Sequence, residues 1–174
     1  MDNYGFVREK LDIKVLILFI LKRLPAPVSQ NLLTELTMID NATNYFDYVE
    51  CLSELEESGH ILLTDDKYSI TPKGVRNGTE MEDHVPFTVR NKALAGIERA
   101  SKILERESLI RTAREEKPEG GLTVSLSLSD RFGELLHVDI LAANQEQARE
   151  MERRFKKNAE SLYLRIAALL TEEQ

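Results

Sequence analysis

The chain of 174 residues has one cysteine, three histidines and no tryptophan. The single cysteine, Cys51, argues against a disulfide framework and against a cysteine-based zinc site. The histidines, at His60, His84 and His137, are far apart, and none has a second histidine or a cysteine at metal-ligand spacing. We therefore expect no metal ion and no cofactor.

The sequence also has no long apolar run and no catalytic motif. Its longest apolar run, Val15–Leu21, is far shorter than the roughly 20 residues that cross a bilayer, and no secretory signal precedes it. The one glycine pair lies between a predicted helix and a predicted strand, which is the wrong order for a phosphate-binding loop. Three alternating serines have no nucleophile elbow around them: Ser125, Ser127 and Ser129. We expect a cytoplasmic protein that contacts no membrane and is not an enzyme.

Acidic residues outnumber basic ones, 30 to 23, so the net charge is −7. This balance does not favour general nucleic-acid binding. The hydrophobic share of 42% is enough for a core, and the length suits one domain or two small ones. The patterns described below mix helices and strands, so the predicted class is α+β.

The first predicted helix, from Asp12 to Leu24, is apolar on every side. Because a helix of this kind must be buried on more than one face, Val15–Leu21 needs more cover than a small domain usually provides. Either the C-terminal half of the chain or a second subunit covers it, or it is the central helix of one larger domain.

The next segment reads as helix, turn, helix and hairpin. Ser29 suits the N-cap of the second helix, and Asn44 suits the N-cap of a third helix, Asn44–Ser58. In this third helix the spacing of four apolar residues predicts the buried face: Tyr45, Val49, Leu52 and Leu55. Gly59 then ends the helix, and two β-prone runs on either side of Asp65-Asp66-Lys67 predict a hairpin.

These motifs resemble a known family. Leu52-x-x-Leu55-Glu56-Glu57-x-Gly59-x-Ile61, followed by Tyr68-x-Ile70-Thr71-x-x-Gly74, resembles the winged helix-turn-helix, and within it the PadR-like transcriptional regulators. The whole chain also resembles an uncharacterised bacterial family of winged-helix proteins. The resemblance implies that helix 44–58 enters the DNA major groove with the hairpin, or wing, beside it, and that the protein regulates transcription.

Candidate DNA contacts follow from this resemblance. Ser29 and Gln30 begin a helix whose backbone N–H groups could hold phosphate, and the polar start of helix 44–58 could reach bases. Three cations flank the wing. The candidate nucleic-acid-binding residues are Ser29, Gln30, Asn41, Thr43, Asn44, Tyr48, Lys67, Lys73 and Arg76.

The charge distribution opposes DNA binding. Up to Glu80 there are eight basic and thirteen acidic residues, a balance of −5, which leaves −2 for the rest of the chain. The stretch Asn44–Gly59 has no lysine or arginine, and four acids are expected to point outward from it: Asp47, Glu50, Glu54 and Glu57. The alternative function is therefore a winged-helix interaction module whose acidic face meets a basic protein or only solvent.

The C-terminal half is predicted as helix, β-hairpin, helix. A helix from Phe87 runs towards Glu116, two alternating strands cover 122–128 and 136–142, and a last helix begins after Asn144. We expect a winged-helix domain over residues 1–82 and a dimerisation domain over residues 83–174. Surplus apolar residues near the C-terminus predict a homodimer interface: Leu162, Tyr163, Ile166, Leu169 and Leu170.

Overall fold

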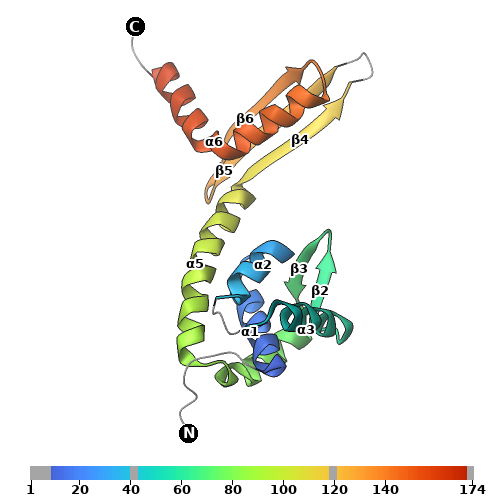
Figure 1. Cartoon of the computed structure of the whole chain (residues 1–174). Helices are drawn as coiled ribbons and strands as arrows, with labels where there is room; N and C mark the ends of the chain where they lie inside the picture. Colours follow the sequence, from blue (N-terminus) through green and yellow to red (C-terminus); the bar gives the residue numbers. More distant parts are fainter. Residues whose placement is uncertain (1–8, 40–42, 118–120, 172–174) are drawn as a thin grey trace. The chain divides into compact units, whose positions relative to one another are not determined.

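A computed structural model describes residues 9–39, 43–117 and 121–171 (Figure 1). The described residues form six α-helices and two antiparallel three-stranded sheets, which confirms the α+β class. The chain divides into two compact units, Met1–Leu104 and Glu105–Gln174, called here the N-terminal and C-terminal units. The predicted domain boundary after residue 82 stays a prediction. Within the described ranges, no helix is long and apolar enough to cross a membrane.

The N-terminal unit contains the first eight elements and most of a ninth. They are α1 (Lys10–Arg23), β1 (Val28–Ser29), α2 (Gln30–Thr37), α3 (Tyr45–Glu57), β2 (Ile61–Thr64), β3 (Lys67–Ile70), α4 (Pro72–Glu80), the 3₁₀ turn η1 (Glu82–His84) and α5 (Phe87–Leu109). The strand order is β1-β3-β2. The boundary between the units lies inside α5.

Helix α1 is the centre of this unit. Every residue of Val15–Leu21 is buried, and α1 packs against α2, α3, α4, β3 and η1. The part of α5 in this unit adds Val89, Ala93, Ile97 and Ala100 to the same core. Helix α4 comes so close that a Cβ on Gly78 would lie 2.9 Å from the Leu18 Cβ. The chain itself therefore covers α1, as the central helix of one larger domain, and α1 does not require a second subunit.

Local signals in the sequence set most of the element boundaries. The Ser29 hydroxyl accepts a hydrogen bond from the backbone N–H of Leu32, and the Asn44 side chain accepts one from Phe46. Gly59 has φ +70°, as expected after a helix end, and Asp65 and Asp66 both have positive φ, as a two-residue hairpin turn requires. The predicted start of the first helix at Asp12 is wrong, because α1 begins at Lys10.

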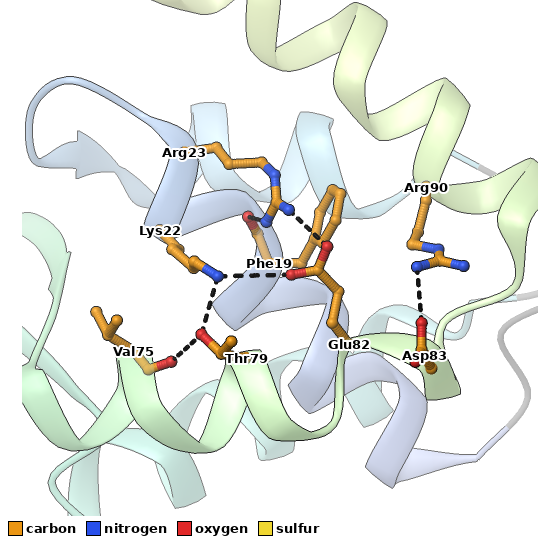
Figure 2. A network of polar contacts seen from close by, with 8 residues as sticks. All are labelled: Phe19, Lys22, Arg23, Val75, Thr79, Glu82, Asp83 and Arg90. Carbon is orange, nitrogen blue, oxygen red and sulfur yellow. Dashed lines mark hydrogen bonds and ion pairs between the residues drawn. The ribbon is translucent and has the colours of Figure 1, made fainter.

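A polar network ties the end of α1 to α4 and η1 (Figure 2). Glu82 accepts a hydrogen bond from Arg23 at 2.6 Å and lies 3.6 Å from the Lys22 ammonium, which donates to Thr79 at 2.8 Å. The Arg23 guanidinium also lies 3.6 Å from the centre of the Phe19 ring. These contacts fix the helices around the core on the side where α1 ends.

The C-terminal unit has one strand more than predicted. Helix α5 ends at Leu109, and β4 (Ile110–Glu116) pairs with β5 (Leu122–Asp130), which pairs with β6 (Gly133–Ala142). The predicted extension of the helix to Glu116 and the two-stranded hairpin are therefore wrong. A two-stranded hairpin is marginal alone, and the third strand gives β5 a hydrogen-bonding partner on both sides. This partner comes from a segment without a clear alternating pattern.

One helix covers one face of this sheet. Helix α6 (Gln145–Thr171) places Ala148, Phe155 and Ala159 against the buried side chains of β5. Asn144 caps it by accepting from the Gln147 N–H at 2.8 Å, as predicted. Inside α6, Asn158 has φ −130° and ψ 18°, which kinks the helix.

Candidate functional site

Helix α3 is rotated relative to the prediction. Its buried residues are Tyr48, Cys51, Leu52 and Leu55, whereas Tyr45 and Val49 are 49% and 37% exposed. The predicted inward face is therefore right for Leu52 and Leu55 and wrong for the other two. Residues 48, 51, 52 and 55 fit the helical repeat as well as the predicted set does, so the apolar spacing alone could not separate the two faces.

Tyr48 cannot contact DNA in this structure. It is fully buried, and its phenol oxygen accepts a hydrogen bond from the Thr34 hydroxyl at 3.2 Å. Burial raises the pKa of Tyr48 to about 12. The prediction of Tyr48 as a nucleic-acid contact is wrong, because the residue joins α3 to α2 instead.

Three apolar side chains are exposed in the first two turns of α3. Phe46 is 79% exposed, and the Tyr45 and Phe46 rings lie edge to face with centroids 6.2 Å apart. Val49 continues this surface one turn on, at helical spacing from both rings. We call Tyr45, Phe46 and Val49 the α3 apolar patch.

Two acids of α3 are paired with lysines of α1. Glu50 lies 2.5 Å from Lys10, and Glu54 forms an ion pair with Lys14. The hydrogen bond to Lys14 lowers the pKa of Glu54, and the hydrogen bond to Glu50 raises the pKa of Lys10. The sequence prediction counted both acids as outward charge. Their charge is instead balanced along the side of α3 that faces α1.

Three of the candidate DNA contacts lie together. The pairing of β1 with β3 sets Ser29 opposite Lys67, and Gln30 follows as the first residue of α2. Gln30 and Lys67 are both exposed. The Thr34–Tyr48 hydrogen bond links this helix to the beginning of α3. The start of α2 therefore lies beside the wing, and a hydrogen bond from the middle of α2 reaches the first turn of α3.

The other candidate contacts are placed differently. The Lys73 ammonium donates to the Ser58 carbonyl at 2.7 Å, at the opposite end of α3 from Asn44. A 13-residue helix is roughly 20 Å long, so Lys73 is separated from the start of α3, and Arg76 follows one turn later on α4. Thr43 is buried, and Asn41 lies outside the described residues.

A groove of about 620 Å³ lies between α1, the end of α3 and α4. Its wall includes Leu11, Val15 and Met81, and His60 lies at its polar side. The His60 ring nitrogens are 2.8 Å from the Ser58 hydroxyl and 2.8 Å from the Asn77 amide nitrogen. Partial burial lowers the pKa of His60. This arrangement ties the wing base to α4 with a neutral histidine.

The sequence did not identify three residues of the α3 surface and its ion pairs: Lys10, Lys14 and Phe46. Lys10 and Lys14 are four residues apart in one helix, and Glu50 and Glu54 have the same spacing in another. Matching spacings of this kind could have indicated that the two helices pair along their length. No comparable signal marked Phe46, because its exposure depends on the phase of α3.

The comparisons with known proteins leave the activity open. The family model described as Domain of unknown function (DUF4364) matches residues 13–170, which is most of the chain. No curated protein and no solved structure matches the chain.

Proposed function

We propose that this chain, which belongs to the DUF4364 family, is a winged helix-turn-helix protein that binds double-stranded DNA and regulates transcription. In this proposal α2 and α3 are the helix-turn-helix, and β2 and β3 are the wing. Helix α3 enters the major groove by its N-terminal half. The resemblance of the wing motifs to PadR-like regulators points the same way.

The observation that carries the proposal is the placing of Ser29 and Gln30 beside Lys67 of the wing, with α2 bonded to the first turn of α3. Ser29 and Gln30 at the start of α2 and Lys67 on the wing can hold phosphates on one side. Phe46 and Val49 are exposed where base edges would lie, and apolar side chains of this kind contact thymine methyl groups. These residues thus offer both positioning and base-reading contacts.

The ion pairs with α1 weaken the electrostatic objection to DNA. Because Lys10 and Lys14 balance Glu50 and Glu54, the repulsion that the sequence predicts for α3 is smaller. Few cations remain for phosphates, so binding to random-sequence duplex should be weak. The slope of log affinity against log salt should be shallow, at about −0.9 for each phosphate contacted.

The test is selection of duplexes from a random library, followed by fluorescence anisotropy with the selected sequence. Phe46→Ala and Asn44→Ala should weaken the selected sequence more than random DNA. Lys67→Ala should weaken binding to the selected and the random sequences equally. It should also make the slope of log affinity against log salt shallower by about 0.9, the value for one phosphate contact. Lys73→Ala is the matched control, because Lys73 lies at the far end of α3, and it should change neither. Failure to enrich any sequence would contradict the proposal.

A second candidate function is a protein-interaction module, and one observation favours it. The α3 apolar patch lies on a helix that also carries the exposed acids Glu56 and Glu57, and the wing turn adds Asp65 and Asp66. An apolar patch at the start of α3, with acids at the end of the same helix and in the wing turn, suits an extended basic protein partner. This surface has more acids than phosphate-binding cations, which is the reverse of most DNA-binding faces.

One double variant separates the two functions. Replacing Glu50 and Glu54 by glutamine frees Lys10 and Lys14 without changing the shape of α3. If the protein binds DNA, its affinity for random duplex should rise. If this variant leaves DNA affinity unchanged while replacing Glu56 and Glu57 by glutamine loses a partner captured from nuclease-treated extract, the interaction module is the right function.

A further inference from the structure

The groove between α1, the end of α3 and α4 has an apolar floor. Val15, Leu18 and Leu55 line it, and each of them is at most 4% exposed. Leu11 and Met81 complete the apolar lining, and Leu11 is 42% exposed, so this side of the groove is open to solvent. The volume of about 620 Å³ lies within the range of pockets that hold small molecules. The groove therefore offers apolar contacts to a ligand of that size.

The lysines of the groove already have partners. Lys14, which lines the groove, forms an ion pair with Glu54 of α3. Lys73, just outside the lining, donates to the Ser58 carbonyl at 2.7 Å, where α3 ends. Moving either ammonium to a ligand would break this bond and leave the partner group unsatisfied. An anionic ligand would have to compete with these partners.

His60 adds no positive charge to the groove. The Ser58 hydroxyl donates to the Glu54 carbonyl at 2.5 Å, so its oxygen, which is 2.8 Å from His60 Nδ1, accepts the Nδ1 proton. In a neutral ring Nε2 is then an acceptor, and the Asn77 amide nitrogen donates to it at 2.8 Å. Burial lowers the pKa of His60, in agreement with a neutral ring. The amide oxygen of Asn77 takes no part in this bond and can accept one from a ligand.

The wall of the groove has a surplus of negative charge. Its charged lining consists of one ammonium, on Lys14, and two carboxylates, on Glu54 and Glu57. Glu57 accepts a hydrogen bond of 3.4 Å from the Ser53 hydroxyl, and within the described residues it forms no ion pair. The carbonyl groups at the C-terminal end of α3 add partial negative charge. A positive group that donates hydrogen bonds is therefore complementary to this wall.

We propose that this groove binds a small molecule with an apolar body and one protonated amine. The body lies on Val15, Leu18 and Leu55, and the ammonium lies at the polar side, where Glu57 and Asn77 provide acceptors. The site does not depend on whether α3 binds DNA, because its lining residues are not among the predicted DNA contacts.

Three compounds of similar shape and different charge test the ligand class. In titration calorimetry with the full-length protein at neutral pH, phenylbutylamine, which is protonated like a lysine side chain, should bind. Phenylbutanol, which is neutral, should bind more weakly, and phenylbutyrate, which is negatively charged, more weakly still. The proposal is overturned if the alcohol binds as tightly as the amine, if the carboxylate binds more tightly than the alcohol, or if the amine shows no binding at millimolar concentration.

A blocking variant tests whether the amine binds in the groove. Leu11→Lys brings a second positive charge to the open side and should abolish binding of phenylbutylamine. Leu63→Lys is the matched control, because Leu63 is 39% exposed, close to the 42% of Leu11, and lies on the wing. It should bind the amine like the wild type, and circular dichroism should show that both variants keep the fold. Unchanged binding by Leu11→Lys, or lost binding by Leu63→Lys, would mean that the amine binds elsewhere and would overturn the proposal.

A charge-removing variant tests the position of the ammonium. Glu57→Gln should weaken phenylbutylamine binding about two- to fivefold, the size of one partly exposed ion pair, and should leave phenylbutanol binding unchanged. Glu56→Gln is the matched control, since Glu56 is the exposed neighbouring acid and is not among the lining residues. It should change neither affinity. An equal loss of amine binding in both variants, or no loss in Glu57→Gln, would overturn the placing of the ammonium beside Glu57.

Discussion

Helix α1 and the second half of α6 have similar apolar content and opposite surroundings. All of Val15–Leu21 in α1 is buried, because five elements and part of α5 surround it. In α6, Leu169 and Leu170 are 75% and 80% exposed, because the Asn158 kink turns the helix off its only sheet. An apolar helix is thus a core element in one unit and a partly exposed surface in the other. The two helices differ in exposure because α1 has packing partners on every side within its unit, whereas the second half of α6 does not.

The largest expected effect is a cavity at the centre of the N-terminal unit. Leu16 is fully buried, so Leu16→Ala should lower the free energy of unfolding by about 2–5 kcal/mol. Leu164→Ala, at a 65% exposed position of α6, should change it by less than about 0.5 kcal/mol. Urea unfolding followed by circular dichroism measures both. Equal losses would mean that the two helices do not differ in burial.

The next effect tests the phase of α3. Leu52→Ala and Leu55→Ala should each cost about 2–5 kcal/mol, because both side chains are buried against the core. Val49→Ala is the control, because Val49 lies on the exposed side of α3, and it should cost less than about 1 kcal/mol. Thermal melts rank the three variants. If Val49→Ala lowered the melting temperature more than Leu52→Ala, Val49 would be buried, as the apolar spacing predicts.

A smaller effect is expected in the polar network where α1 ends. Glu82→Gln removes the charge that Arg23 and Lys22 share, and these side chains are only about a quarter exposed. The free energy of unfolding should fall by roughly 1 kcal/mol, below the value for a fully buried hydrogen bond to a charged group, because solvent screens a partly exposed pair. Asp83→Asn is the matched control, since Asp83 is 98% exposed in its pair with Arg90, and it should be nearly neutral. The same urea measurement checks both variants.

The smallest effect is a pH dependence from His60. Burial lowers the pKa of His60 below its usual value of 6.5, so the unfolded chain takes up a proton at a higher pH than the folded chain does. The stability of the N-terminal unit should therefore fall as the pH drops below 6.5, towards the folded pKa. His60→Gln should flatten this dependence between pH 7 and pH 5.5 in thermal melts. If His60→Gln showed the same pH dependence of the melting temperature as the wild type, His60 would not be the source of that dependence.

Helix starts, stops and turns could be predicted because they depend on neighbours along the chain. Ser29 and Asn44 cap helices by bonding backbone groups two or three residues away, and Gly59 can take the positive φ that ends α3. The alternation of Leu122–Leu128 likewise predicted a half-buried strand, and its apolar members are buried. Each of these outcomes follows from local sterics and hydrogen bonding.

The tertiary structure alone decided which partners these elements meet. It selected Tyr48 and Cys51 over Tyr45 and Val49 as the buried face of α3, because Tyr48 reaches Thr34 across the helix pair. It turned Ile110–Glu116 into a strand, because β5 offers a free edge to pair with. It also balanced Glu54 with Lys14, forty residues away in the chain. The sequence determined where elements begin and end from short-range contacts, while faces, pairings and charge balance depend on residues that only folding brings together.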